Sequence, residues 1–245
     1  MVKHVLRFLL RPRWIAFHIG CLALIVLMAN LSAWQFHRLT ERRDFNERVR
    51  DRSSITAVDV DTIDLSDPSS ASWRRVGAAG TYLPDEQVLI LNRSQNGVAG
   101  LNVVTPLLLD TGDVVAVARG FVPLSVQPPT APAGRVRVVG VLRESENRKS
   151  GQPREADGDL TEMFNLDLVR LQAQIDEPVL PLWLAADGSD PTDDPILTPV
   201  APPELSEGPH LSYAIQWIIF AICVVVGWVL ALRRSIRRAR STPSA

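Results

Sequence analysis

The stretch that decides the fold is WIAFHIGCLALIVLMANLSAWQFH, residues 14–37, which contains no Asp, Glu, Lys or Arg. Its core, residues 15–33, is built of Leu, Ile, Val, Ala and Phe with few interruptions. A second uncharged run covers residues 208–232 and is strongly apolar from residue 211 onward. A helix needs roughly 20 apolar residues to cross the hydrocarbon core of a bilayer. Both runs are long enough, so we expect two transmembrane helices, at 14–37 and 208–232.

Basic residues flank each apolar run on the side that faces a chain terminus. They are Lys3, Arg7, Arg11 and Arg13 before the first run, and Arg233, Arg234, Arg237, Arg238 and Arg240 after the second. Short basic flanks stay on the cytoplasmic side of a membrane. We therefore expect a plasma-membrane protein whose segments 1–13 and 233–245 are cytoplasmic and whose segment 38–207 is extracytoplasmic.

A cleaved signal peptide is the alternative interpretation of the first run, because a basic start followed by an apolar stretch fits that as well. The apolar stretch is longer than the usual hydrophobic region of a signal peptide. The best cleavage position, after Ala33, has Leu31 where a small residue is wanted. We therefore favour an uncleaved anchor.

The charge of the central segment excludes one class of function. Residues 34–210 carry 17 basic and 27 acidic residues, a net charge of −10. No basic stripe is present to neutralise phosphates, so we expect no nucleic-acid binding. Cys21 and Cys223 both lie in the apolar runs, so the external domain has no thiol for a disulfide.

The central segment is expected to form an α+β domain, an antiparallel sheet with one short helix. Residues 38–52 are dense in both charges and predict a helical extension of the first span. Val-rich runs separated by turn residues predict strands. These runs are 74–82, 87–92, 102–109, 114–118, 135–142 and 180–185, with a hairpin over 109–114.

Two further segments complete the domain. Residues 165–175 predict the short helix, with Leu166, Val169 and Ile175 near one face. Residues 187–207 are acidic and rich in Pro, and predict an extended, solvated linker back to the membrane. The Asp spacing at 187–194 is not that of a calcium-binding EF-hand loop.

The residues needed for catalysis are missing from the external domain. No His lies between His37 and His210, so no Ser-His-Asp triad can form. No Gly-x-Ser-x-Gly motif and no Gly-rich phosphate loop occurs. A Ser/Lys dyad at the membrane face would need Lys149, which lies in the polar loop sequence NRKSG at 147–151. We therefore expect a protein that is not an enzyme, and a membrane-anchored hydrolase is disfavoured.

Polar residues in the two spans occur at matching depths. Antiparallel helices bring His37 and His210 to a similar level at the outer ends, and Asn30 level with Gln216. We expect an Asn30–Gln216 hydrogen bond, since polar residues often bond across membrane helices. The alternatives are snorkelling or a partner protein. Trp34 shares a stripe with Asn30 and His37.

On the second span, His210, Tyr213, Ala214 and Trp217 fall at i, i+3, i+4 and i+7 and share one face. A neutral imidazole is a usual haem ligand, and the small Ala214 leaves room for a flat macrocycle beside the rings. The alternative is that the aromatic residues belong to an interfacial belt and that His210 lies among the lipid headgroups.

Three stretches resemble a known family. GPHLSYAIQW at 208–217 resembles the second-span signature of the Surfeit locus protein 1 family of cytochrome c oxidase assembly factors. WQFHR at 34–38 resembles the end of that family's first span, and RGFVP at 119–123 resembles a stretch of its domain. The segments 105–107 and 134–143 lie in the expected order. The resemblance covers nearly the whole chain.

The resemblance implies a function and a set of partners. It implies an assembly factor of the aa3-type cytochrome c oxidase that holds haem a and aids its insertion into oxidase subunit I. It also implies that His210 is the haem ligand, and the helix face that His210 shares with Tyr213 and Trp217 makes these two residues candidates for lining the site. Expected partners are subunit I, other oxidase subunits, the lipid bilayer and a larger respiratory supercomplex. The alternative is a cofactor-free structural or scaffold subunit of the same complex.

Some positions depart from the family pattern or have open roles. Ser32 replaces a Gly that the family has two residues before the first-span Trp, which argues against close backbone packing there. His37 is outside the pattern, and its use as a second axial ligand is our own hypothesis. Arg119 is either a surface Arg at a strand end or a contact for a haem propionate or a partner. Structural or partner-contacting roles are expected for Trp34, Gln35, Arg38, Gln216 and Asn30.

Overall fold

The computed structural model describes residues 11–148, 151, 155 and 158–241. The chain divides into two compact units. The described part of the first unit is formed by residues 11–47 and 205–241, and the second unit is formed by residues 48–204. The positions of Lys3, Arg7 and Lys149, to which the sequence analysis gave roles, lie outside the described residues.

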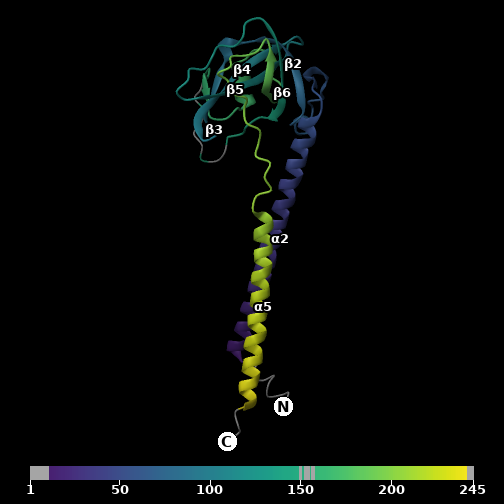
Figure 1. Ribbon diagram of the computed structural model, residues 1–245, viewed down its shortest axis with the longest axis vertical. Helices are drawn as coiled ribbons and strands as arrows, with labels where there is room; N and C mark the ends of the chain where they lie inside the picture. The colour runs from purple at the N-terminus through teal and green to yellow at the C-terminus, as the bar shows by residue number, and fades with distance from the viewer. Residues whose placement is uncertain (1–10, 149–150, 152–154, 156–157, 242–245) are drawn as a thin grey trace. The chain divides into compact units, whose positions relative to one another are not determined.

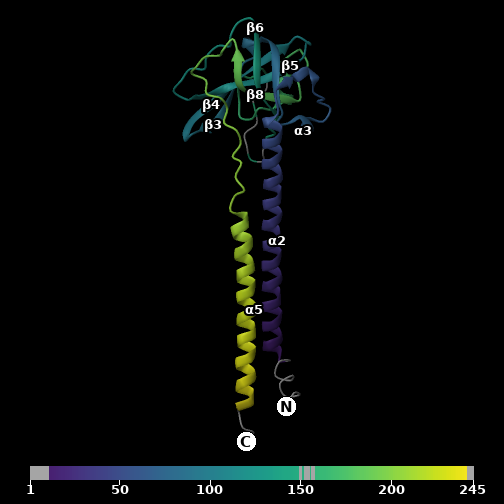
Figure 2. The ribbon, with the colours of Figure 1, turned by 45° about the vertical axis from the view of Figure 1, so that its right-hand side comes forward.

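The first unit is a pair of long helices, α2 (Pro12–Ser54) and α5 (His210–Ser241). Pro12 is the first residue of α2, a position that suits its fixed φ and missing N–H. Both helices are long and apolar enough to cross a membrane, with mean hydropathies of 2.1 and 2.5 in their apolar windows. They lie side by side in Figure 2, and in Figure 1 α5 passes in front of α2. Two apolar helices and the helical extension after the first one are confirmed.

The second unit is a β domain whose eight strands follow the order β1-β2-β6-β8-β5-β4-β3-β7. The strands are β1 (Val58–Asp59), β2 (Arg75–Tyr82), β3 (Val88–Gln95), β4 (Val98–Leu109), β5 (Val114–Pro123), β6 (Arg135–Glu144), β7 (Glu162–Met163) and β8 (Leu182–Asp190). The expected strands are present, and β3, β5 and β8 extend further along the chain than expected. The other helical elements are η1 (Val60–Thr62), α3 (Pro68–Ala71), η2 (Pro84–Glu86) and α4 (Leu168–Gln172).

An additional pairing between β2 and β4 closes five of these strands, β2, β6, β8, β5 and β4, into a ring. Gly80 makes this closure possible, because a Cβ there would lie 2.0 Å from the carbonyl oxygen of Leu108. Most neighbours are antiparallel as expected, whereas β1–β2, β3–β7 and β5–β8 are parallel. The domain is therefore a small β-barrel with extra strands at its edges.

The core lies on both faces of β5, which is buried along almost its whole length. Side chains alternate across a strand. Val115 and Val117 accordingly belong to one apolar cluster, and Val114, Ala116 and Ala118 to another. The first cluster fills the ring, and the second lies beneath α4. This explains why β5 is a continuous apolar run rather than an alternating one.

The short helix α4 differs from the prediction in the face that it buries. Leu168 and Leu171 are buried, together with the flanking Leu166 and Ile175. Val169 was expected on that face, but it is 80% exposed. Asp167 explains the difference, because its side chain accepts from the Val169 N–H and starts the helix later than expected.

Candidate functional site

His210 is the first residue of α5, and its imidazole is held by one side chain of α2. Its Nδ1 lies 2.8 Å from the Oε1 of Gln35. A carbonyl oxygen only accepts hydrogen bonds, so the proton of a neutral His210 is on Nδ1. The other ring nitrogen, Nε2, then carries the lone pair. The pair therefore presents an imidazole in the tautomer that binds a metal through Nε2.

The loop before α5 leaves the edge of this imidazole uncovered. Gly208 has a φ of +66°, in the left-handed region that favours glycine. A Cβ at Gly208 would lie 3.5 Å from the Nε2 of His210, in van der Waals contact with it. A side chain there would cover the nitrogen that can bind a metal. Gly208 thus permits the turn before α5 and also leaves Nε2 of His210 accessible.

The two helices also contact one another one turn below His210. The hydroxyl of Ser32 donates to the carbonyl oxygen of Ala214 at 3.0 Å. Ser32 is 5% exposed and Ala214 is fully buried. Two expectations are therefore wrong. Ser32 does not prevent close backbone packing, because its small side chain bonds across the interface, and Ala214 offers no space for a macrocycle, because α2 occupies it.

The expected Asn30–Gln216 hydrogen bond is not formed. The amide of Asn30 donates to the carbonyl of Val26 in its own helix at 2.8 Å, and Gln216 is exposed at the surface of the pair. The depth of the two residues was estimated correctly, because Ser32–Ala214 and Gln35–His210 follow the same antiparallel register. The directions in which Asn30 and Gln216 point around their helix axes were not estimated correctly.

His37, the other histidine expected at the outer helix ends, faces away from His210. His37 is two positions beyond Gln35, about 200° around the helix. Its Nε2 lies 3.2 Å from Glu41, and its side chain is 73% exposed. Arg38 also contacts Glu41 at 2.8 Å and lies over the ring of Trp34. The structure therefore does not bring His37 to His210.

Aromatic side chains of α5 flank the candidate site. Tyr213 is 47% exposed, and Trp217 is half-buried with its ring 5.8 Å from that of Phe220. Trp34 of α2 is 52% exposed. Their rings lie outside the contact between the helices, so they offer apolar surface around the helix ends.

Two further contacts join the helical segments, and neither was expected. The guanidinium of Arg43 donates to both carboxylate oxygens of Glu207, at 2.9 and 3.0 Å. This bidentate contact raises the pKa of Arg43. At the opposite end, the indole N–H of Trp228 donates to Nδ1 of His18 at 2.8 Å. Pairings of this kind depend on which helix faces meet, and neither apolar run reveals that alone.

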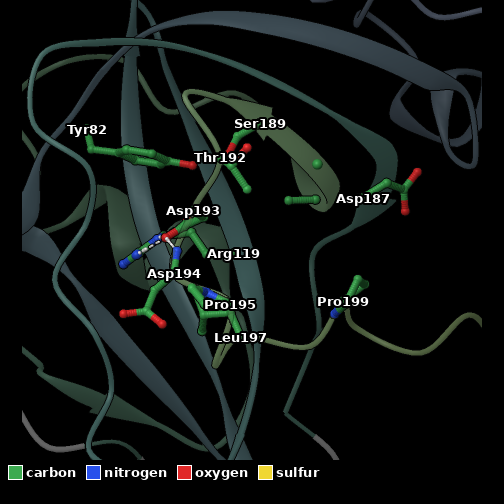
Figure 3. Close-up of a pocket in the computed structure, with 12 residues that line it drawn as sticks. Tyr82, Arg119, Asp187, Ser189, Thr192, Asp193, Asp194, Pro195, Leu197 and Pro199 are labelled. Carbon is green, nitrogen blue, oxygen red and sulfur yellow. Dashed lines mark hydrogen bonds and ion pairs between the residues drawn. The ribbon is translucent and has the colours of Figure 1, made fainter.

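Arg119 lies in the middle of β5 and is the best-connected side chain of the β domain. Its side chain has no exposed surface. Its Nε and Nη2 donate to the two oxygens of Asp193, at 2.8 and 2.6 Å (Figure 3). The other acceptors are Gln87, Thr105 and the carbonyls of Pro129 and Thr130. Arg119 is therefore neither a surface residue nor free to contact a propionate or a partner.

The residues after Arg119 contact the segment that follows β8. We call this segment, residues 193–203, the returning segment. A Cβ at Gly120 would lie 2.8 Å from the carbonyl of Thr198, and Phe121 exchanges two backbone hydrogen bonds with Thr198. The stretch 119–121 thus fixes residues 193–198 against the barrel. The sequence predicted a solvated linker from residue 187 onward. This prediction is wrong for residues 187–193, because β8 runs to Asp190 and Asp193 is ion-paired inside the domain.

A pocket of about 150 Å³ lies beside Arg119, under the ring of Tyr82 (Figure 3). Burial raises the pKa of the Tyr82 hydroxyl, and the nearby Asp193 adds to this shift. The guanidinium in this pocket is neutralised and all its hydrogen bonds are internal. The pocket is thus a feature of the domain's packing rather than a binding site for an anion.

The described residues combine two apolar helices of membrane-spanning length, a small β-barrel and an imidazole at the helix ends, an arrangement that suggests a membrane-associated protein. Among residues 11–148 and the other described positions, no group of three or more His, Cys, Asp or Glu side chains could hold a metal ion. At the helix ends, the hydrogen bond of Nδ1 to Gln35 leaves Nε2 of His210 as the ring nitrogen with a lone pair.

The model of the SURF1 family matches residues 22–222, so the chain belongs to that family. An uncharacterized SURF1-like protein of Mycobacterium tuberculosis is 32% identical over 232 residues, which cover 91% of this chain and 84% of that protein. The Surfeit locus protein 1 of Takifugu rubripes is 30% identical over 144 residues, 50% of this chain and 60% of that protein. The family expected from the sequence is confirmed. Its members are known generally as oxidase assembly factors.

Proposed function

We propose that this protein assists the assembly of the aa3-type cytochrome c oxidase by holding haem a at the outer ends of its two helices and passing it to subunit I. The proposal includes the orientation that the basic flanks favour, with both termini in the cytoplasm and the β domain outside. It rests on membership of the SURF1 family and on one observation in particular. That observation is the Gln35–His210 hydrogen bond.

The hydrogen bond supports the proposal because of what it does to the imidazole. Metal-binding His residues usually donate their other N–H to an acceptor, which fixes the tautomer and the ring orientation. Gln35 is such an acceptor, and Gly208 leaves Nε2 accessible. When bound, haem would supply an iron that accepts the Nε2 lone pair as an axial ligand. The residues present therefore fit the cargo.

The helix packing restricts where the cargo can lie. Ala214 and Ser32 close the space between the helices, so the macrocycle lies against the outer surface of the pair rather than inside it. Tyr213, Trp217 and Trp34 supply apolar and aromatic surface there. Attachment through one imidazole, without a second ligand from His37, suits a cargo that must be released to a partner that binds it more tightly.

The experiment is complementation of a strain that lacks the gene. The haem a absorption of its membranes is compared after expression of the parent protein, His210→Ala, Gln35→Leu and His37→Ala, each at equal abundance in the membrane. We expect His37→Ala to restore the oxidase signal as the parent does. His210→Ala should fail, and Gln35→Leu should restore part of it.

The alternative, a cofactor-free scaffold, gives a different result. If His210→Ala restored the full haem a signal, no haem ligand would be needed, and the scaffold function would replace the proposal. If deletion itself left the oxidase signal unchanged, a role in oxidase assembly would be excluded for this chain in that organism.

A further inference from the structure

The β domain contains a second and larger pocket, of about 340 Å³, whose most prominent charged group is Arg143. We call it the Arg143 pocket. All its lining residues belong to the second unit. They come from the last turns of α2, from β6 and β8, from the turn after β3 and from residues 199–203 of the returning segment. Its volume lies within the range of small-molecule sites.

Two indole rings hold Arg143 in place. The guanidinium carbon lies 4.9 Å from the ring centroid of Trp73 and 5.0 Å from that of Trp183. Trp183 is buried, and its N–H donates to the carbonyl of Glu144 at 2.8 Å. Trp73 has a φ of +69°, a conformation that is costly for a residue with a side chain. The backbone thus keeps a strained residue at the position from which its ring reaches Arg143.

The charge of Arg143 has no counter-ion within the described parts of the chain. No hydrogen bond or ion pair to its guanidinium is formed there. Glu146, the nearest acid that favours its charge, is bonded to Arg93 and to the N–H of Leu166. Asp187, the other charged lining residue, is paired with Arg75 at 2.6 Å. Desolvation by burial lowers the pKa of Arg143.

The rest of the lining is largely apolar. Apolar side chains surround the guanidinium on both the barrel side and the side of the returning segment. They are Val49, Trp73, Val141, Ala185, Pro199, Val200, Ala201, Pro202 and Pro203. Gln95 fixes this returning segment, because its amide donates to the carbonyl of Pro199 and accepts from the N–H of Ala201. The pocket therefore has a fixed wall.

Charge and shape together identify the ligand class. A guanidinium presents a planar fork of donors that matches a carboxylate, and its N–H groups stay in its plane when rings cover its faces. An apolar lining with one unneutralised cation selects an anion that carries an apolar group. We propose that the Arg143 pocket binds a small molecule in which a carboxylate is joined to an apolar body. This site is separate from His210.

The contrast with Arg119 supports the assignment. Both guanidinium groups lie beside an aromatic ring in the same domain. Arg119 donates to Asp193 and to other acceptors of the protein, whereas the donors of Arg143 have no acceptor among the residues that the structure describes.

The test uses the full-length protein in phosphatidylcholine nanodiscs, labelled with 5-fluorotryptophan. The six Trp signals are assigned by Trp→Phe variants and followed by ¹⁹F NMR during titration with 2-naphthoate. We expect saturable shifts of the Trp73 and Trp183 signals. The four Trp residues of the helices report on uptake of the probe by lipid and should move only linearly. The neutral analogue 2-naphthylmethanol should not reproduce the saturable shifts.

Variants distinguish the contribution of the Arg143 charge to naphthoate binding from the contribution of the cavity. Arg143→Gln should weaken naphthoate binding about tenfold or more, since it removes the charged donor. Val141→Trp fills the pocket and leaves Arg143 in place, and it should also abolish the saturable shift. Arg137→Gln is the matched control, because Arg137 lies on the same strand and is exposed and paired with Asp59. His210→Ala should bind naphthoate as the parent does, whatever becomes of the proposed haem function.

Two results would overturn the proposal. One is equal saturable binding of the neutral alcohol, which would reveal an apolar surface without selection for an anion. The other is naphthoate binding of parental strength in both Arg143→Gln and Val141→Trp. If Arg143→Gln lost its fold, as seen from the Trp signals without ligand, Val141→Trp alone would decide between the outcomes.

Discussion

In the β domain, Arg119 is fully buried and makes six hydrogen bonds within the protein. In the helix pair, the half-buried His210 makes one, to Gln35, and keeps its other nitrogen uncovered. Both residues belong to the stretches that resemble the family. One such stretch therefore stabilises the fold through a fully bonded side chain, whereas the other leaves a ring nitrogen without a hydrogen bond, and burial and hydrogen-bond saturation distinguish the two.

The largest effect is expected from removing the buried charge of the domain. Arg119→Met leaves the carboxylate of Asp193 buried without its partner, so we expect a loss of about 3–5 kcal/mol in the free energy of unfolding. The denaturant midpoint of the full-length protein measures this. The control is Arg137→Met, whose exposed ion pair with Asp59 should be worth less than about 1 kcal/mol. Equal midpoints for the two variants would contradict the structural role of Arg119.

A smaller loss is expected from Gly120→Ala. The added Cβ would lie 2.8 Å from the carbonyl oxygen of Thr198, so the returning segment must move. We expect a destabilisation of about 1–3 kcal/mol, measured in the same denaturant series. Gly188→Ala is the control, because a Cβ there meets no atom within 4 Å. If both variants unfolded at the parental midpoint, Thr198 would not be held by close approach to β5.

The sequence was sufficient for the features that depend on local patterns. A long uncharged run predicts a helix of membrane-spanning length from its own composition, and the Val-rich runs predicted where β2, β5 and β6 begin. The hairpin at 109–114 was recognised from its turn residues, and the N–H of Leu109 indeed donates to the carbonyl of Asp113.

The failures concern partners that are distant in the sequence or set by rotation. Arg119 and Asp193 are 74 residues apart, and no local pattern shows that the barrel brings them together. Counting residues gave the depth of Asn30 and Gln216 in their helices, but the facing sides depend on how the two helices pack. Gln35 was assigned only a structural or partner role, although its position in a family-like stretch beside a level His could have suggested the contact with His210.

In the helix pair, the contact to test is that between Ser32 and Ala214. Ala214→Leu places a large side chain where Ala214 is fully buried against α2, so we expect it to separate the helices locally. The expected cost is about 1–3 kcal/mol, seen as a lower thermal midpoint in detergent. Leu211→Ala, on an exposed position of the same helix, is the control. An unchanged midpoint for Ala214→Leu would mean that the helices do not meet there.

The smallest expected effect concerns pH. The hydrogen bond from Arg38 holds the pKa of Glu41 below its ordinary value of 4.5. This contact therefore stabilises the folded state above pH 4.5, and the contribution is lost as the pH falls through the lowered pKa. Carboxyl ¹³C NMR should give Glu41 a midpoint below 4.5 in the parent and a higher one in Arg38→Gln. Identical midpoints would show that Arg38 does not bond Glu41 in solution.

Haem binding through His210 is tested most directly by the absorption spectrum of the purified full-length protein after co-production with the enzymes of haem a synthesis. We expect a Soret band in the parent and in His37→Ala, no band in His210→Ala, and a weaker or shifted band in Gln35→Leu. A Soret band of parental intensity and position in His210→Ala would contradict haem binding through His210.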